Sequence, residues 1–293
     1  MKRFIGPLLI LSCTVIWGTA FLAQKTGCEH YGPFALTCYR NLLAAGFLAL
    51  FCIRRGGRFA RGETLGGALS GLVLCAAMVA QQLGIEHTTP GVSAFLTANY
   101  ILLVPVLGWL IGKGRPHVSI WLGVALATAG AFLISFGSGG ESIGIGIGEA
   151  WTLCCAVLFA VQIMVVDRFA PNCDVIRFSM MQTLVAALCA APLMLLPGEA
   201  SRLTLAHFKA GWFSLFYVGI MSSGIAYTLQ NLGQARTPAS LAAILMSFES
   251  VVGAVSGWLV LGDALSGRQI VGCALVFGAI MLVQILPSLG KRF

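Results

Sequence analysis

The chain has 293 residues, of which 58% are hydrophobic and only 10% are charged, whereas about 25% of residues are charged in ordinary soluble domains. A water-soluble chain of this length could not bury so much apolar surface, so the composition predicts a membrane protein. The net charge of +8 does not indicate nucleic-acid binding, because the Lys and Arg residues lie between apolar runs and form no basic stripe.

Ten apolar segments are long enough to cross the hydrocarbon layer as helices, which takes about 20 residues. In chain order they cover residues 5–24, 34–53, 65–85, 92–111, 118–136, 147–166, 175–196, 211–231, 239–260 and 269–287. The first segment follows Lys2 and Arg3 like a signal peptide, but it is as long as a full span and no small-residue cleavage site ends it. We therefore expect it to be retained as a helix.

The distribution of Lys and Arg predicts the orientation, because basic residues concentrate in cytoplasmic loops. With the N-terminus inside, thirteen basic residues fall on the cytoplasmic side: Lys2, Arg3, Arg54, Arg55, Arg58, Arg61, Lys113, Arg115, Arg168, Arg177, Arg236, Lys291 and Arg292. Four fall outside: Lys25, Arg202, Lys209 and Arg268. We expect a multi-pass protein of the plasma (bacterial inner) membrane with both termini in the cytoplasm.

The cysteines do not suggest a disulfide framework or a metal site. Most of the ten lie in apolar runs, and Cys28 is the only one expected in an external loop. No Cys-x-x-Cys pair or Cys/His cluster is present in the sequence.

The two halves of the chain resemble each other at an offset of about 149 residues. Leu83-Gly84 corresponds to Leu232-Gly233, and Gly108-Trp109-Leu110 corresponds to Gly257-Trp258-Leu259. The glycine-rich stretch 137–148 is the expected linker, so we divide the chain into five-helix halves at 1–138 and 139–293. Because five is odd, the second half enters the membrane upside down. Inverted repeats of this kind are common in secondary transporters, whose substrate site lies near the midplane. The predicted fold is therefore all-α, with ten transmembrane helices in two inverted five-helix repeats.

The sequence resembles the drug/metabolite transporter superfamily, specifically its EamA-type ten-helix members. The residues that carry the resemblance are Trp17-Gly18, Pro33 with Arg40, Thr88-x-Pro90, Ser247-Phe248-Glu249-Ser250-Val251 and Leu261-Gly262-Asp263. The chain has Glu249-Ser250 where the family often has Glu-Pro, so the resemblance does not predict a kink in helix nine. It implies export or import of amino acids and related metabolites without ATP.

Two charged residues lie within predicted spans, where a charge is costly and often functional. Glu249 is near the middle of the ninth segment. It could bind a proton that couples transport to the proton gradient, or pair with a substrate ammonium group, or be a protonated acid that holds neighbouring helices together. Arg40 lies about two turns into the second segment. It could bind a substrate carboxylate, close an external gate, or reach lipid headgroups by snorkelling.

Further polar and aromatic residues at membrane depth are candidates for the substrate site. The offset places Tyr100 opposite Glu249, so a two-fold relation would bring both to a central cavity together with Asn99. Tyr227 and Gln230 are three residues apart and share a helix face. The alternative for each is a hydrogen bond between helices. The complete set of candidates is Glu249, Asn99, Tyr100, Trp17, Gln82, Gln162, Tyr227, Gln230 and Arg40.

A secondary transporter of small metabolites fits these features best, with export favoured and proton coupling as one option. An intramembrane enzyme is an alternative, but Ser222-Ser223-Gly224 has no evident base and no metal motif occurs. A channel is the other alternative, but no filter-like sequence is visible. We expect no enzymatic activity and no cofactor. The expected partners are a small-molecule substrate and the lipid bilayer, with no nucleic acid, and the chain is expected as a monomer or homodimer.

Overall fold

The computed structural model describes residues 2–88, 90–135, 146–196, 204–261 and 266–289. Within these residues, ten helices are long and apolar enough to cross a membrane, which confirms the ten predicted spans. They are Phe4–Tyr31, Pro33–Arg55, Arg61–His87, Val92–Leu110, Val118–Ser135, Ile147–Asn172, Val175–Leu195, Leu205–Gln234, Ala239–Ser256 and Gly267–Gln284. The linker expected at 137–148 and the boundary between residues 138 and 139 fall mostly or wholly outside the described residues.

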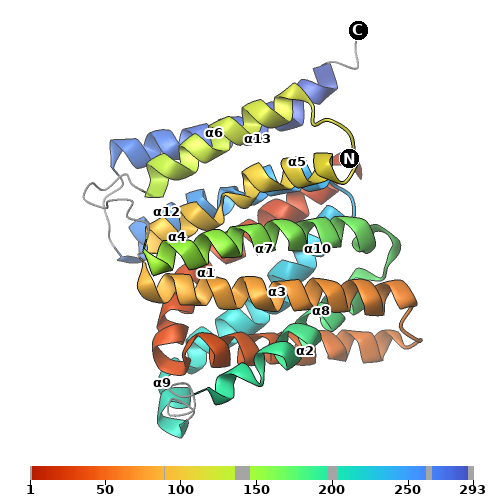
Figure 1. Cartoon of the computed structure of the whole chain (residues 1–293), viewed down its shortest axis with the longest axis vertical. Helices are drawn as coiled ribbons and strands as arrows, with labels where there is room; N and C mark the ends of the chain where they lie inside the picture. Colours follow the sequence, from red (N-terminus) through yellow and green to blue (C-terminus); the bar gives the residue numbers. More distant parts are fainter. Residues whose placement is uncertain (1, 89, 136–145, 197–203, 262–265, 290–293) are drawn as a thin grey trace.

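Several spans consist of more than one helical element. In chain order the elements are α1 (Lys2–Tyr31), α2 (Pro33–Arg55), α3 (Arg61–His87), α4 (Pro90–Thr97), α5 (Tyr100–Leu110), α6 (Val118–Ser135), α7 (Ile147–Phe169), η1 (Ala170–Asn172), α8 (Val175–Ala190), η2 (Leu193–Leu195), α9 (Leu205–Phe216), η4 (Tyr217–Ala226), α10 (Tyr227–Gln234), α11 (Ala239–Met246), α12 (Phe248–Leu261) and α13 (Gly267–Leu289). Figure 1 shows these helices as one bundle, in which α6 and α13 lie side by side at one end of the long axis and α2 and α9 lie towards the other.

The first helix is longer than predicted, and this changes the place of Cys28. Instead of ending near residue 24, α1 continues to Tyr31. A single residue, Gly32, joins it to α2, with a φ of 80° that favours glycine. Cys28 is therefore buried in a helix, where its thiol donates to Gln82 Oε1 at 2.9 Å, and the prediction of an external loop at this position was wrong.

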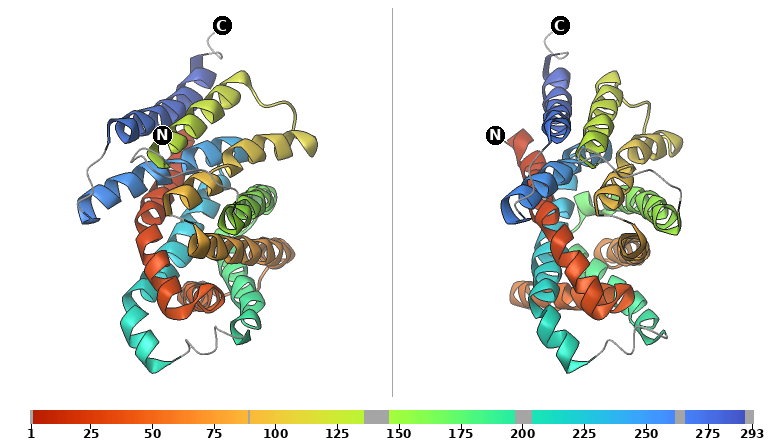
Figure 2. Two further views of the ribbon diagram at one scale, coloured as in Figure 1. Left: turned by 60° about the vertical axis from the view of Figure 1, so that its left-hand side comes forward. Right: turned by 90° about the vertical axis from the view of Figure 1, so that its left-hand side faces the viewer.

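Contacts between helices recur at equivalent places in the two halves. Gly84 of α3 crosses Gly148 of α7, where a Cβ added at Gly84 would lie 3.2 Å from the Gly148 carbonyl oxygen. Gly233 of α10 crosses Gly6 of α1, where the corresponding distance is 2.9 Å. The third span of each half thus packs on the first span of the other half, as two-fold related repeats require. Two further views of the bundle show α1 and α10 adjacent, as these contacts require (Figure 2).

The fourth and ninth spans are both interrupted, and the two breaks lie at equivalent positions of the two halves. One break lies at Ala98 and Asn99, between α4 and α5, and the other lies at Ser247, between α11 and α12. At each break the backbone makes a tight turn, with Ile101 N donating to Ala98 O at 3.0 Å and Ser250 N donating to Ser247 O at 3.1 Å. Neither break contains a proline, so helix nine is interrupted without the Glu-Pro pair that the family often has there.

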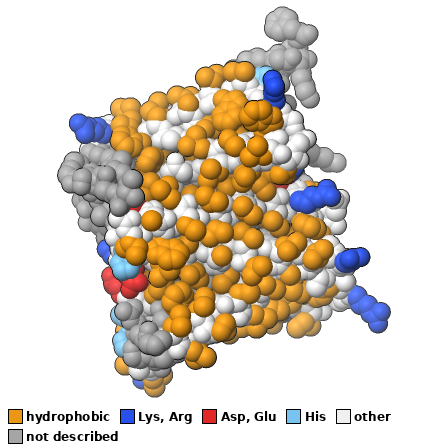
Figure 3. Space-filling model, in the orientation of Figure 1, with side chains coloured by type: hydrophobic (Ala, Val, Ile, Leu, Met, Phe, Trp, Pro, Cys, Tyr) orange, Lys and Arg blue, Asp and Glu red, His pale blue; other side chains and the backbone are white. Residues whose placement is uncertain are grey.

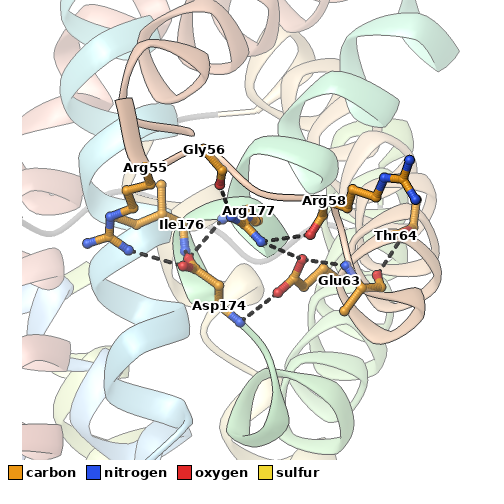
Figure 4. Close-up of polar contacts among 9 residues, drawn as sticks. Arg55, Gly56, Arg58, Glu63, Thr64, Asp174, Ile176 and Arg177 are labelled. Atoms are coloured by element: carbon orange, nitrogen blue, oxygen red, sulfur yellow. Dashed lines mark hydrogen bonds and ion pairs between the residues drawn. The ribbon is translucent and has the colours of Figure 1, made fainter. Parts of the chain in front are cut away.

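An ionic cluster connects the two halves at one end of the bundle (Figure 4). Arg55 pairs with Asp174 at 3.1 Å, and Arg177 lies 3.8 Å from Glu63. Arg177 also donates to the carbonyl oxygens of Gly56 and Arg58. The cluster therefore holds the α2–α3 connection against the start of α8.

The surface has the distribution expected of a membrane-spanning bundle. Hydrophobic side chains cover the middle of the face drawn in Figure 3. Most of the Lys and Arg side chains visible there lie along the right-hand edge, which is the side where Figure 1 marks the N-terminus. Large apolar side chains such as Leu8, Leu50, Leu188 and Phe213 are exposed. In water they would be unfavourable, whereas in lipid they match their surroundings.

Candidate functional site

A cavity with about 500 Å³ of empty space, part of it open to the outside, lies between spans of both halves. Its lining is mostly aromatic and polar, with one cationic and one acidic residue. The lining residues are Trp17, Phe21, Gln24, Arg40, Gln81, Thr97, Tyr100, Phe159, Gln162, Ile163, Ser222, Tyr227, Gln230, Met246 and Glu249. A concave site with a few convergent polar groups is the usual form of a small-molecule site.

Glu249 and Tyr100 meet across the cavity. The Tyr100 hydroxyl donates to Glu249 Oε1 at 3.3 Å, and the two residues are 149 positions apart, so they occupy equivalent positions of the two halves. Each lies directly after the break in its span, at the start of α5 and in the first turn of α12. Glu249 is only 8% exposed, so its carboxyl group is held inside the protein and not against lipid.

Arg40 is buried beside the same cavity, with 2% of its surface exposed. Its Nε donates to Ser223 Oγ at 2.8 Å, and its two terminal nitrogens donate to Ser222 Oγ at 2.9 Å and Gln24 Oε1 at 3.1 Å. A guanidinium in this position does not snorkel to lipid headgroups. The ion pairs within the described residues involve neither Arg40 nor Glu249.

Both serine partners of Arg40 lie in a stretch of unusual helix geometry. Residues Tyr217–Ala226 form a π-helix, η4, in the middle of the eighth span. Ser222 and Ser223 are consecutive residues, and in an α-helix their side chains would point about 100° apart. In η4, Ser222 and Ser223 both hydrogen-bond to one guanidinium. Short π-helical stretches within α-helices are frequent at functional sites.

Aromatic side chains form one wall of the cavity. Trp17 and Tyr227 pack edge to face with ring centroids 4.9 Å apart. The Trp17 indole also donates to the carbonyl oxygen of Ser222 at 3.3 Å. This bond links α1 to the π-helix, so the same wall supports the serines around Arg40.

A chain of amides lines another part of the cavity. Gln230 Nε2 lies 3.4 Å from Gln162 Oε1 and 2.9 Å from Gln234 Oε1, and Gln234 in turn donates to the Ile163 carbonyl at 3.2 Å. The Gln230 side-chain oxygen is buried without a hydrogen-bond partner in the structure. A buried acceptor of this kind could bind a polar group of a ligand.

Seven of the nine predicted site residues therefore line the cavity, and two do not. Gln82 lies behind it, where its amide donates to Gln24 Oε1 at 3.1 Å. Asn99 turns back to its own helix, where Nδ2 donates to the Phe95 and Leu96 carbonyls at 3.2 and 3.1 Å. These carbonyls lie in the turn before the break between α4 and α5, so Asn99 stabilises the break.

The structure adds cavity residues that the sequence analysis did not select. Gln24 and Ser222 both bond to Arg40 and line the cavity. Gln24 was placed at the end of the first segment, whereas α1 continues to Tyr31, so Gln24 lies within the helix. Ser222 and Ser223 had been weighed only as a nucleophile, and here their hydroxyls accept hydrogen bonds from Arg40. Among the described residues, no cluster of three or more His, Cys, Asp or Glu could hold a metal ion.

Comparison with known proteins gives a consistent family assignment. A family model described as the EamA-like transporter family matches residues 4–136 and 146–285. An uncharacterized transporter of Archaeoglobus fulgidus is 25% identical over 97% of this chain and 87% of its own length. A probable amino-acid metabolite efflux pump of Salmonella typhimurium is also 25% identical, over 96% of this chain and 95% of its own length.

Two further similarities concern location and fold. An uncharacterized inner membrane transporter of Escherichia coli, YedA, is 25% identical over 99% of this chain and 93% of its own length. A solved crystal structure superposes with a TM-score of 0.81 at 19% identity, covering 96% of this chain and 98% of the other. At that identity the structural match shows the shared fold alone.

Proposed function

The chain belongs to the EamA-like transporter family, and from that premise we propose that it exports amino acids or related small metabolites as a secondary transporter. The observation that carries the proposal is the central cavity, which both halves line and which contains one buried cation and one buried acid. A cavity with both charges suits a zwitterionic substrate. The efflux pump named above is a relative over nearly the whole chain, and this favours amino acids as substrates and export as the direction.

The mechanism that we propose is alternating access, in which the halves 1–138 and 139–293 rock against each other as inverted repeats. Three observations support it. Equivalent glycines pack the halves together, at Gly84–Gly148 and at Gly233–Gly6. The fourth and ninth spans are interrupted at equivalent positions. Tyr100 and Glu249, which also occupy equivalent positions, are hydrogen-bonded to each other. The gathering of basic residues at the end where the N-terminus lies favours cytoplasmic termini.

Glu249 is the residue that we propose for coupling. It is an acid at membrane depth that faces a cavity, which is the usual setting of a proton relay. Among the described residues, its side chain is hydrogen-bonded to the Tyr100 hydroxyl, a group that can both donate and accept. Binding of a proton and binding of a substrate ammonium group would each neutralise the carboxylate, so the two events could compete for Glu249.

The proposal is tested by counterflow in proteoliposomes loaded with a panel of amino acids, with and without a pH gradient. Wild-type protein should exchange substrate across the membrane, and the gradient should change net transport. Glu249→Gln keeps the size of the side chain but cannot release a proton, so its transport should no longer respond to the gradient. Glu86→Gln is the matched control, because Glu86 is an exposed acid near the end of α3.

Two results would contradict this reading. Flux without counterflow would indicate a channel and not a carrier. An unchanged response of Glu249→Gln to the pH gradient would show that Glu249 does not couple transport to protons, although it could still bind the substrate.

A further inference from the structure

We propose that Arg40, held by Gln24, Ser222 and Ser223, binds the carboxylate group of the transported molecule. The inference rests on the proposed function and makes it more specific. It predicts that a free carboxylate is required of every substrate, and it assigns that group to one end of the cavity. Four residues from α1, α2 and the π-helix η4 form this arrangement, which we term the Arg40 clamp.

Arg40 is charged, and no described residue forms an ion pair with it. The guanidinium is 2% exposed and lies at membrane depth, where an isolated charge is expensive. Within the described residues its three side-chain partners are neutral oxygens, two hydroxyls and one amide. These bonds satisfy three N–H donors but do not neutralise the positive charge. A bound anion would supply the negative charge that the described part of the chain does not place beside Arg40.

Arg40 also has N–H donors that its three side-chain bonds do not use. A guanidinium has five N–H groups. Nε and each terminal nitrogen make one of the three bonds, so each terminal nitrogen retains one N–H. Arg40 also lines the cavity. Two donors on adjacent nitrogens match the two oxygens of a carboxylate, the pairing in which arginine is most often bidentate.

The charges around the cavity favour a carboxylate over a phosphate as the ligand of Arg40. Among the described residues that line the cavity, only Arg40 and Glu249 are charged. A carboxylate brings a single negative charge, which Arg40 neutralises. A doubly charged phosphate would leave excess negative charge in a site that already contains an acid, and burial of an unpaired charge is strongly unfavourable.

The partners of Arg40 in the clamp are themselves held by further hydrogen bonds. Ser222 presents its hydroxyl to Arg40 while its carbonyl accepts the Trp17 indole N–H. Gln24 accepts from Arg40 and from the Gln82 amide with the same oxygen. These second bonds hold the partners of Arg40 in place, so a ligand meets a preorganised site, and little ordering is needed on binding.

The test compares three forms of each substrate in proteoliposomes containing wild-type protein: L-leucine, L-threonine and L-phenylalanine, their methyl esters, and the amines left after decarboxylation. Free acids should show counterflow, whereas esters and amines should neither exchange nor inhibit. Arg40→Gln should lower counterflow of the acids at least about tenfold, because a charge-assisted pair is lost. It should also abolish the discrimination between acids and esters, and that loss would not follow from a purely structural role.

Two further variants separate binding from folding. Arg40→Lys keeps the charge and should retain part of the preference for free acids, although it cannot form the bidentate pair. Arg54→Gln is the matched control, since Arg54 is an exposed arginine in the last turn of the same helix, and it should behave as wild type. Thermal unfolding in detergent identifies any variant that fails to fold.

The outcomes distinguish the clamp from the transporter proposal. If acids, esters and amines exchange equally well, or if Arg40→Gln keeps the preference for free acids, the clamp is wrong and the transporter proposal stands. If none of the compounds shows counterflow in wild-type protein, amino-acid transport is wrong and the clamp falls with it. Counterflow restricted to free acids, and dependent on Arg40, supports both.

Discussion

Glu249 and Tyr100 occupy the same position in the two halves, yet they have different chemistry. The pairing of an acid in one half with a phenol in the other gives the two-fold arrangement a single carboxyl group instead of two. Two acids at this distance would repel each other in a medium of low dielectric. The cavity therefore has different chemistry on its two sides, and among its described lining residues Glu249 on α12 and Arg40 on α2 carry the charges.

Asn99 shows how a residue next to the cavity can have a structural role. It was predicted as a site residue because it is polar and central in its span. The position of Asn99 along the span gives its depth, but it does not give the direction in which its side chain points. The structure directs its amide to the Phe95 and Leu96 carbonyls, because the break that follows leaves carbonyls of α4 without their usual helical partners.

We therefore expect Asn99→Ala to affect stability more than substrate affinity. Loss of two hydrogen bonds should lower the free energy of unfolding by about 1–2 kcal/mol, measured by thermal unfolding in detergent. The counterflow half-saturation constant should stay within about twofold, because Asn99 does not line the cavity. Gln162→Ala, a cavity-lining amide, should show the opposite pattern. A large loss of substrate affinity in Asn99→Ala would mean that its side chain turns into the cavity during transport.

At the scale of the element, the spans follow from the sequence, but their interruptions do not. Each span needs only about 20 apolar residues, a property that is visible in composition. The breaks at Ala98–Asn99 and Ser247 contain no proline. Only the structure shows that the two breaks exist and that they lie at equivalent positions of the two halves. The π-helix Tyr217–Ala226 likewise has no sequence signal beyond small residues such as Gly219 and Gly224, which allow α2 to pack close to it.

Close packing of α6 on α13 provides a test at this scale. A Cβ added at Gly272 would lie 2.7 Å from the Gly130 carbonyl oxygen and 2.9 Å from Ile134 Cγ1. Backbone cannot move aside as a side chain can, so Gly272→Ala should lower the free energy of unfolding by about 1–3 kcal/mol. Gly278 is the control on the same helix, since a Cβ there would have nothing within 4 Å. Gly278→Ala should be neutral, or should stabilise α13 by less than about 1 kcal/mol. Equal stability of the two variants in a thermal scan would show that the helices do not approach this closely.

At the scale of the whole molecule, helix packing and the hydrogen bonds around the cavity join the halves within the membrane, while ion pairs join them at one end. Such a division is expected, because charged groups are stable where water reaches and costly in lipid. A sequence can locate basic residues near span ends, as it does for Arg55 and Arg177, but it does not show their partners. The partners come from connections more than 100 positions away along the chain.

The ionic cluster of Figure 4 is centred on Glu63, and its removal should weaken the contact between the halves. The Glu63 side chain is 6% exposed. One of its oxygens accepts the Asp174 N–H at 3.1 Å, and the other accepts the Ala60 N–H at 2.8 Å. Glu63→Gln retains one acceptor oxygen, loses the other, and removes the charge opposite Arg177. We expect a loss of about 1–3 kcal/mol in the free energy of unfolding, measured in detergent.

Arg55→Gln is the matched control, because it removes an ion pair whose arginine is 54% exposed. Solvent screens such a pair, so its loss should cost less than about 1 kcal/mol. The difference between the variants should also persist at high salt, because salt screens exposed pairs and leaves buried hydrogen bonds largely intact. If Glu63→Gln were as mild as Arg55→Gln, the α2–α3 connection would be attached to α8 only loosely. The halves would then depend mainly on helix packing at this end of the bundle.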